Sequence, residues 1–195
     1  MLGITETWLN TTYSCSSVAI DGYNLERRDR STGRGGGMAV YLHDGVPCDR
    51  RHDLEKDLWV EIKCPCSIGI LLGTVYRPPV NTRIDNWWSL IESTLEITQC
   101  ESKETILMGD ININFVNGVV TNEKWRGVVD AFQLTQVITS PTRVTATTDT
   151  LIDHIYTTHP QHVRTSKVDI LSASDHLPVV MLRKRNSTKA VVPVQ

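Results

Sequence analysis

The chain has 195 residues, of which 40% are apolar and 22% are charged, as is ordinary for a single globular domain with a sizeable core. Its formal net charge of −2 argues against a passive, strongly basic nucleic-acid binder, but not against an enzyme whose bound metal attracts phosphate locally. No window of the sequence approaches the roughly 18 apolar residues that a membrane-spanning helix needs.

Strands dominate the predicted structure of the first part of the chain. Short strands are predicted at Leu2–Thr5, Gly37–Leu42, Leu58–Lys63 and Ile68–Tyr76. The last of these is an apolar run that Pro78 and Pro79 stop. The segment Arg27–Gly37 is rich in glycine and arginine and is predicted to be a loop.

Helices and further strands are predicted in the rest of the chain. A helix is predicted at Thr82–Thr98, where Trp87, Trp88 and other apolar residues recur at helical spacing, so we interpret the tryptophans as core residues. A second helix is predicted at Asn122–Phe132 for the same reason. The remaining predicted strands are Thr105–Met108, Leu151–Tyr156, Val163–Ile170 and Val179–Leu182.

These elements predict an α/β fold. A few helices among many strands indicate a two-sheet β-sandwich that is flanked by helices, because each sheet must bury its apolar face against another layer. We expect one domain over residues 1–185 and a disordered tail over residues 186–195.

The N-terminus and the cysteines bear on the compartment. Residues 1–10 have no basic leader, and polar residues interrupt their apolar run, so they do not form a secretory signal. The five cysteines are an odd set, and the pair Cys64 and Cys66 has no second pair at zinc-ligand spacing. We therefore expect reduced thiols in a nuclear or cytoplasmic protein that is not secreted.

Polar side chains collect where predicted strands end. Glu6 follows the first strand directly, Asp110 follows the apolar run that begins at Thr105, and Asn112 comes two residues later. His176 follows another apolar stretch. Side chains at such positions emerge at the rim of a sheet, where sites are usually built. Hydrolysis of a phosphate ester needs a carboxylate for Mg²⁺, a carboxylate for water and donors for the charge on phosphorus, and these four residues together supply those types.

Six motifs occur along the chain in this order: Thr5–Leu9 (TETWL), Gly35–Tyr41 (GGGMAVY), Tyr76–Pro79 (YRPP), Gly109–Asn112 (GDIN), Thr150–Ile155 (TLIDHI) and Ser174–Pro178 (SDHLP). This series resembles the endonuclease domain of LINE-type, jockey-like retrotransposons. The resemblance covers almost the whole chain and places it in the endonuclease/exonuclease/phosphatase superfamily, with pancreatic deoxyribonuclease and the apurinic/apyrimidinic repair endonucleases. It implies a deoxyribonuclease-like four-layer α/β sandwich.

The resemblance also implies a role for each matching residue. Glu6 matches the ligand of the metal, which would be Mg²⁺ with Mn²⁺ as the alternative, and Asp175 matches a residue near that metal. Asp110 matches the carboxylate that orients or deprotonates the attacking water. Asn112 matches the amide that holds the phosphate and the water.

A second set of matches surrounds the phosphate. Asp153 matches the carboxylate that pairs with the catalytic His176, which would then face the scissile phosphate as donor or acid. Tyr76 matches a phosphate-contacting tyrosine, and Thr142 matches a small polar residue near the DNA backbone. Ser174 is expected to support the loop at the substrate.

Arginines supply the remaining candidates for substrate binding. Arg28 and Arg30 lie in a run of four arginines that ends at Arg34, and Arg77 belongs to the YRPP motif. Such a run could follow the DNA backbone, but a solvated face explains it equally well. The other basic clusters are Arg50–Arg51 and Arg183–Arg185.

The chain departs from the family at its start. The family's first strand and helix are expected to be missing, which would leave a strand edge unpaired and remove one polar group from the metal site. Three functions therefore stay open: a Mg²⁺-dependent endonuclease that nicks DNA, a phosphatase of small or lipid phosphate esters on the same scaffold, and a non-catalytic remnant of a mobile element. The TETWL and YRPP motifs favour the nuclease, with DNA as the partner and no membrane involved. No protein partner follows from the sequence.

Overall fold

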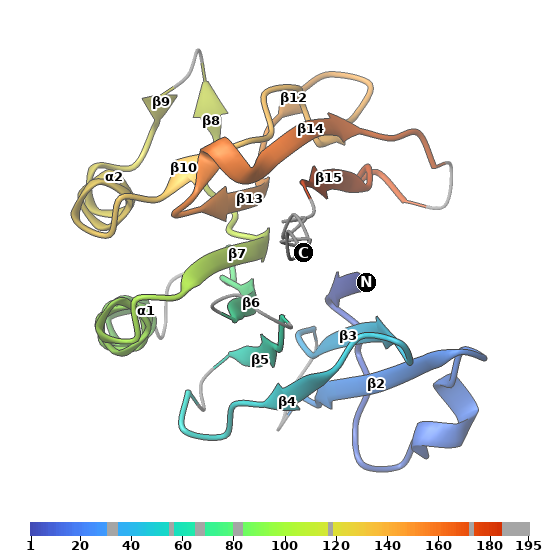
Figure 1. The fold of residues 1–195 in the computed structure, drawn as a ribbon. Coiled ribbons are helices and arrows are strands. Elements are labelled where there is room, and N and C mark those ends of the chain that lie inside the picture. Colours follow the sequence, from blue (N-terminus) through green and yellow to red (C-terminus); the bar gives the residue numbers. More distant parts are fainter. Residues whose placement is uncertain are drawn as a thin grey trace, which may run out of the picture.

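A computed structural model gives the fold of the chain (Figure 1). It describes residues 1–30, 35–54, 57–64, 69–79, 84–116, 119–171 and 174–184. Arg34, Cys66, Arg185 and the predicted tail at 186–195 lie outside the described residues. None of the helices in the described part of the chain is long and apolar enough to cross a membrane.

The main sheet forms the middle layer. Within the described residues it has six strands in the order β10-β13-β7-β6-β5-β4. The strands are β4 (Cys48–Arg50), β5 (Leu58–Ile62), β6 (Ile70–Tyr76), β7 (Glu104–Asp110), β10 (Thr135–Gln136) and β13 (Asp153–Thr157). The neighbours β6 and β7 run parallel because the chain crosses between them through helix α1, whereas the other pairs are antiparallel.

Helices α1 (Ile84–Cys100) and α2 (Glu123–Ala131) cover one face of the main sheet (Figure 1). Asn122 caps α2, because its side chain accepts the backbone N–H of Trp125 at 3.0 Å. Trp125 is fully buried, and its indole N–H donates to the hydroxyl of Tyr156 on β13. The prediction of two helices with tryptophans in the core is confirmed, with bounds shifted by one or two residues where they are described.

A second layer covers the opposite face of the main sheet. One part is the antiparallel sheet β1-β3-β2, made of β1 (Leu2–Thr5), β2 (Tyr23–Arg28) and β3 (Met38–His43). The other part is the antiparallel pair β14 (Val163–Val168) and β15 (Val179–Arg183). Side chains from β3, β5, β6 and β7 form the apolar core between the layers, in which Val40, Leu58, Leu72 and Ile106 are buried. The predicted α/β sandwich is therefore confirmed.

The remaining elements are short. They are the pairs β8 (Phe115–Val116) with β9 (Val119–Val120) and β11 (Arg143–Val144) with β12 (Asp149–Thr150), and the 3₁₀ helices η1 (Cys15–Val18) and η2 (Pro160–His162).

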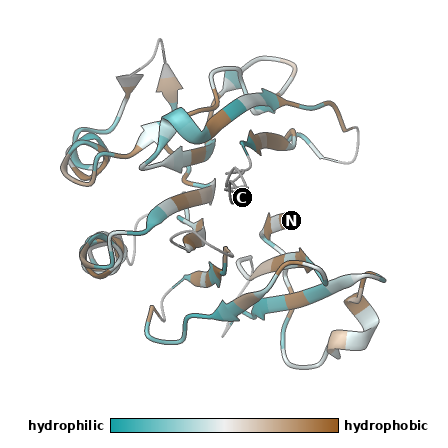
Figure 2. Ribbon diagram, in the orientation of Figure 1, coloured by the Kyte–Doolittle hydropathy of each residue, from teal (hydrophilic) through white to brown (hydrophobic). Residues whose placement is uncertain are grey.

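The prediction of a loop at Arg27–Gly37 is wrong at its start. Arg27 and Arg28 lie in β2, which pairs with β3 along its full length. The polar composition of β2 is compatible with a strand because β2 is the edge of its sheet, where charged side chains reach water. Figure 2 shows the same polarity on β4, the edge strand of the main sheet. The pattern that indicated a loop was therefore the pattern of an edge strand.

A buried carboxylate joins the two layers at the start of β7. Glu104 is 6% exposed and accepts hydrogen bonds from Arg183 on β15 and from the ring of His162. Burial raises the pKa of Glu104, but Arg183 and His162 outweigh it and hold the pKa below its ordinary value. The guanidinium of Arg183 is therefore bound to Glu104 and connects β15 to the start of β7.

We expect Glu104→Gln to destabilise the fold by about 2–4 kcal/mol, because it leaves a partly buried cation without its anion. Since the pKa of Glu104 is depressed, its contribution is present at neutral pH and is lost only as the pH falls through the depressed pKa. Urea unfolding of both proteins at pH 7 measures the difference. The exposed pair Lys167–Asp169 supplies the control, and Asp169→Asn should leave the urea midpoint unchanged. An unchanged urea midpoint for Glu104→Gln would contradict a stabilising contact between Glu104 and Arg183.

Candidate functional site

Three predicted site residues lie at one rim of the main sheet. Tyr76 ends β6 and Asp110 ends β7, and the two are register partners because these strands are parallel. Asp153 begins the antiparallel β13 and is the register partner of Asp110 on its other side. The carboxyl ends of β6 and β7 therefore bring their polar side chains beside the first residue of β13.

A group of three titratable side chains gathers at this rim. Among the described residues, Asp110, Asp153 and His176 offer ligand atoms within 4.8 Å of one another. His176 comes from the segment before β15, and its Nδ1 lies 2.9 Å from Oδ2 of Asp153 and 3.1 Å from Oδ1. The structure thus brings together the carboxylate and the imidazole that the sequence paired, along with the predicted water-binding carboxylate.

Thr142 fixes the position of Asp153. Its hydroxyl donates to Oδ2 of Asp153 at 2.8 Å and accepts the backbone N–H groups of Ile152 and Asp153. Its carbonyl accepts the N–H of Leu177, one residue after His176. Thr142 is fully buried and its polar atoms are engaged within the protein, so its expected place near the DNA backbone stays a prediction. Thr142 connects the two partners of the Asp153–His176 pair.

Burial and the neighbouring charges raise the pKa values of Asp110 and His176. Burial, followed by repulsion from Asp153, raises the pKa of Asp110 to about 6. The hydrogen bond to Asp153 raises the pKa of His176 above its ordinary value, against the opposing effect of burial, and the charges of Asp153, Asp110 and Asp175 add to the increase. The rim therefore favours the protonated form of His176 and disfavours the ionised form of Asp110.

The chain bends sharply around Asp110. Gly109 has φ +140°, and a Cβ at this position would lie 1.9 Å from the carbonyl oxygen of Val75 on β6, so only glycine fits between the strands here. Asn112 has φ +51°, which is uncommon outside glycine, and its backbone N–H donates to Oδ1 of Asp110. The GDIN motif is therefore a strained turn that aims the Asp110 carboxylate.

Arg77 supports this turn from inside the protein. Its guanidinium donates to the carbonyl oxygens of Ile111 and Asn112 at 3.3 and 3.2 Å and lies over the ring of Trp88. Its own carbonyl accepts the side-chain amide of Asn112 at 2.8 Å. The side chain of Arg77 is buried beneath the turn, and its expected role in substrate binding stays a prediction.

Glu6 and Tyr76 form the other side of the rim. The carboxylate of Glu6 accepts the indole N–H of Trp8 and the backbone N–H of Gly36, each at 2.7 Å. Burial, then the hydrogen bond to Glu6 and the charges of Glu6 and Asp110, raise the pKa of Tyr76 above its ordinary value. Glu6 is therefore a hydrogen-bond partner of Tyr76 and is not one of the three clustered residues.

Asp175 and Ser174 do not join the cluster. The carboxylate of Asp175 accepts the side-chain N–H of Arg143 at 2.8 Å, and both side chains are largely exposed. The structure thus pairs Asp175 with Arg143, and the expected place of Asp175 near the metal stays a prediction. Ser174 accepts the backbone N–H of His176, as expected for a residue that supports the loop. Arg143 was missed, although the sequence places it directly after Thr142.

The predicted basic patch is largely occupied by ion pairs. Arg27 pairs with Asp29, and Arg50 pairs with Glu26. Arg51 contacts Asp53, Glu61 and Glu101. One terminal nitrogen of Arg28 is buried, and the charge of Arg28 acts on the buried Asp57. The expected substrate role of Arg28 is therefore weakened, whereas Arg30 retains an untested role.

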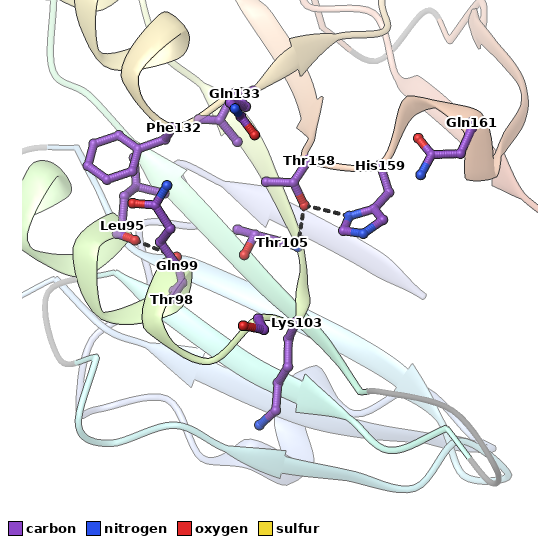
Figure 3. A pocket seen from close by; sticks show the side chains of 12 residues that line it. Leu95, Thr98, Gln99, Lys103, Thr105, Phe132, Gln133, Thr158, His159 and Gln161 are labelled. Carbon is purple, nitrogen blue, oxygen red and sulfur yellow. Dashed lines mark hydrogen bonds between the residues drawn. The ribbon is translucent and has the colours of Figure 1, made fainter.

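A separate cavity of about 310 Å³ lies at the opposite end of β7 (Figure 3). It is lined mainly by neutral hydrogen-bonding side chains, including Gln99, Thr158 and His159, and by Lys103, which is paired with Glu61 and Glu101. It contains none of the predicted site residues. The length of β7, on the order of 20 Å, separates it from Asp110.

Several solved structures of known proteins share this fold. The endonuclease domain of TRAS1, a telomere-specific non-LTR retrotransposon, is 18% identical, with a TM-score of 0.67 over 86% of this chain and 83% of that one. An AP endonuclease from Archaeoglobus fulgidus is 16% identical, with a TM-score of 0.64 over 93% and 87% of the two chains. The mannosyl-6-phosphatase Bt3783 from Bacteroides thetaiotaomicron is 17% identical, with a TM-score of 0.60 over 92% and 84%.

A search of curated protein sequences found no match. The sequence profile of the Endonuclease/Exonuclease/phosphatase family, in contrast, matches residues 1–176, which span the rim from Glu6 to His176. Members of this family are hydrolases. With its sandwich and its family profile together, the chain belongs to the endonuclease/exonuclease/phosphatase family.

Proposed function

We propose that the protein is a Mg²⁺-dependent endonuclease of the retrotransposon type, which nicks DNA by hydrolysing a phosphodiester bond. The observation that carries this proposal is the group of Asp110, Asp153 and His176 at one rim. It combines a carboxylate for water with an imidazole that a second carboxylate orients, which is the chemistry that phosphodiester hydrolysis requires.

The donor set of the rim fits a hard divalent cation. The carboxylates of Glu6 and Asp110 both act on Tyr76, and Asp153 raises the pKa of Asp110. A cation there would relieve this repulsion, and oxygen ligands suit Mg²⁺, with Mn²⁺ as the alternative. Glu6 and Asp110 are the residues that would hold it. When bound, it would polarise the phosphoryl oxygen and stabilise the leaving oxygen.

Each residue at the rim would then either transfer a proton or bind the phosphate. Asp110 would orient and deprotonate the attacking water, and its raised pKa suits a base that works near neutral pH. Since Nδ1 of His176 faces Asp153, its Nε2 is the ring nitrogen left for the phosphate, where the protonated ring would donate a proton or hydrogen bond. Asn112, which is held by Arg77, and Tyr76 would bind the phosphate oxygens.

The substrate is proposed to be DNA because of the relatives and the sequence motifs. The similar structures include retrotransposon and AP endonucleases and a 3′ phosphatase from Neisseria bound to a product DNA hairpin. The similarity to a mannosyl-6-phosphatase favours a second candidate, a phosphatase of small phosphate esters on the same rim.

A plasmid-nicking assay tests the proposal. The folded protein should relax supercoiled plasmid in Mg²⁺ and lose this activity when EDTA removes the metal. Asp110→Asn should lower the rate at least about 100-fold, because the amide cannot take a proton from water. Release of phosphate from mannose 6-phosphate without nicking would replace the first candidate by the second. Neither activity in a folded protein would mean a non-catalytic chain.

The same substitution should stabilise the protein. Because the folded-state pKa of Asp110 is raised to about 6, stability falls as the pH rises from about 4 to about 6 and stays lower at neutral pH. Asn112 keeps its acceptor in Asp110→Asn, but the buried charge is gone. We expect the unfolding free energy at pH 7.5 to rise by roughly 1–3 kcal/mol, with no difference between the two proteins near pH 4. Thermal unfolding at both pH values measures this, and a less stable variant at pH 7.5 would contradict the electrostatics of the rim.

A further inference from the structure

Five residues other than glycine have a positive φ in the described part of the chain. Three of them are Glu6, Trp8, which donates to Glu6, and Asn112, so they belong to the two sides of the candidate site. The other two, Ser102 and Gln133, both have φ +52° and both line the separate cavity at the start of β7. Because backbone strain of this kind gathers at functional sites, the cavity deserves the same question as the rim.

Each of these two residues ends a helix. Ser102 follows α1 and Gln133 follows α2, and the two helices end at the same cavity (Figure 3). The left-handed residue after a helix is usually glycine or asparagine, because a larger side chain makes this backbone conformation costly. The chain thus keeps a serine and a glutamine at the cavity where glycine would strain the backbone less.

The cavity has a buried floor. Leu95, Thr105 and Leu134 line it and are 1%, 2% and 5% exposed. The hydroxyl of Thr105 has no hydrogen-bond partner among the described residues, although its backbone N–H donates to the hydroxyl of Thr158. Since buried polar groups are normally satisfied, the Thr105 hydroxyl is a group that a ligand can bond at the bottom of the cavity.

Three glutamine side chains surround the mouth of the cavity. Gln99 lies at the end of α1, Gln133 follows α2, and Gln161 lies in η2, and all three residues are exposed. Their side-chain amides make no hydrogen bond within the described part of the chain. Each amide offers a donor and an acceptor side by side, which is the pattern that matches N6 and N7 of adenine.

Aromatic rings stand on two sides of the cavity. Figure 3 shows Phe132 and His159 across it from one another. The ring of His159 is held by the hydroxyl of Thr158, 2.9 Å from its Nδ1, and by stacking on the ring of His162 at 5.1 Å between centroids. Because Glu104 binds His162 in turn, this wall is anchored to the start of β7. Flat heterocycles stack on rings of this kind.

The charges around the cavity disfavour an anion. Lys103 is the one permanently charged side chain among the described residues that line it, and its ammonium group lies 2.7 Å from Glu61 and 2.8 Å from Glu101. The carbonyl ends of α1 and α2 add partial negative charge. A phosphate group would therefore be repelled, whereas an amine that donates hydrogen bonds is favoured.

We propose that this cavity binds an uncharged purine nucleoside that carries an exocyclic amine, as adenosine does. The cavity volume of about 310 Å³ lies at the lower end of the range of small-molecule sites. The base would lie between Phe132 and His159, with the glutamine amides at its edge. The inference does not depend on the proposed function, because the length of β7, on the order of 20 Å, separates the cavity from Asp110.

Calorimetric titration of the whole chain with matched ligands tests the proposal. Adenosine should bind with a dissociation constant on the order of 0.1 mM and raise the melting temperature. AMP adds only a phosphate group and should bind at least about tenfold more weakly, because Glu61 and Glu101 repel it. Inosine carries an oxygen in place of the amine and should also bind at least about tenfold more weakly.

Two variants locate the binding. Thr105→Val removes the unpartnered hydroxyl and should weaken adenosine binding at least about fivefold without lowering the melting temperature. Gln133→Gly should raise the melting temperature, because glycine adopts φ +52° without strain, and should still weaken binding at least about fivefold. Thr94→Val is the control, since Thr94 is buried in α1 but does not line the cavity, and it should bind adenosine as the native protein does.

Other outcomes would overturn the proposal. No binding of adenosine and no rise in melting temperature would exclude a nucleoside, as would native affinity in both Thr105→Val and Gln133→Gly. AMP or inosine that binds as tightly as adenosine would contradict the selection for an uncharged ligand with an amine. Tighter binding of a short deoxyadenosine oligonucleotide than of adenosine would assign the cavity to a nucleic-acid strand.

Discussion

Asp153→Asn should slow DNA nicking by a factor of roughly 100 to 10,000 while the protein stays folded. Asp153 accepts the ring N–H of His176 and the hydroxyl of Thr142, so its charge both orients the imidazole and raises the pKa of His176. An asparagine retains the size of the side chain but can present its amide to Nδ1, which stabilises the wrong tautomer. Single-turnover rates in Mg²⁺ measure the loss.

The pH profile separates this effect from a loss of structure. Because the folded pKa of His176 is raised by Asp153, the protonated form should persist to higher pH in the native protein than in Asp153→Asn. The alkaline limb of the activity profile should therefore move to lower pH in the variant. Asp149→Asn, in the exposed strand β12, is the matched control and should keep the native rate and profile. A full rate for Asp153→Asn would refute the role of the pair.

Arg77→Ala should destabilise the protein by about 2–4 kcal/mol and reduce nicking as well. The variant leaves the carbonyls of Ile111 and Asn112 without their donor and opens a cavity beside Trp88. These carbonyls belong to the strained turn after Asp110, so the variant should no longer hold the Asp110 carboxylate in its position at the rim. Urea unfolding and the nicking rate, measured on the same samples, report the two effects.

Lys124→Ala is the matched control for Arg77. Lys124 also lies over the ring of Trp88, at 5.2 Å, but its side chain is exposed and bonds no part of the turn. We expect both its stability and its nicking rate to stay near the native values. A form of Arg77→Ala with native stability but weakened DNA binding would mean that the arginine reaches the substrate after all.

The sequence predicts the rim better than it predicts the supports beneath it. Asp110 and His176 could be singled out because each follows an apolar run of the sequence, whereas Asp153 was assigned only through the resemblance to the retrotransposon endonucleases. Thr142 and Arg77 were assigned to the substrate because a short motif match gives the identity of a residue but not the direction of its side chain. Burial decides that question, and it depends on packing partners, such as Trp88, that are distant in sequence.

The sequence also predicted the edge strands and the ion pairs poorly. The run of arginines around Arg28 left a phosphate-binding surface and a solvated face equally open, and the acidic partners of Arg27, Arg50 and Arg51 come from several separate segments of the chain. No local pattern brings Glu101 to Arg51, since the sheet and the end of α1 have to form first. The same is true of Glu104 and Arg183, whose pairing joins the two layers.

A double-variant cycle at the rim tests most directly whether Asp153 and His176 act as one hydrolytic unit. The nicking rates of the native protein, Asp153→Asn, His176→Ala and the double variant are compared in Mg²⁺ under single-turnover conditions. If the pair works as a unit, the double variant should be no slower than His176→Ala alone, and both should be at least about 100-fold slower than the native protein. Losses that multiply, or four equal rates, would contradict a shared catalytic centre at Asp153 and His176.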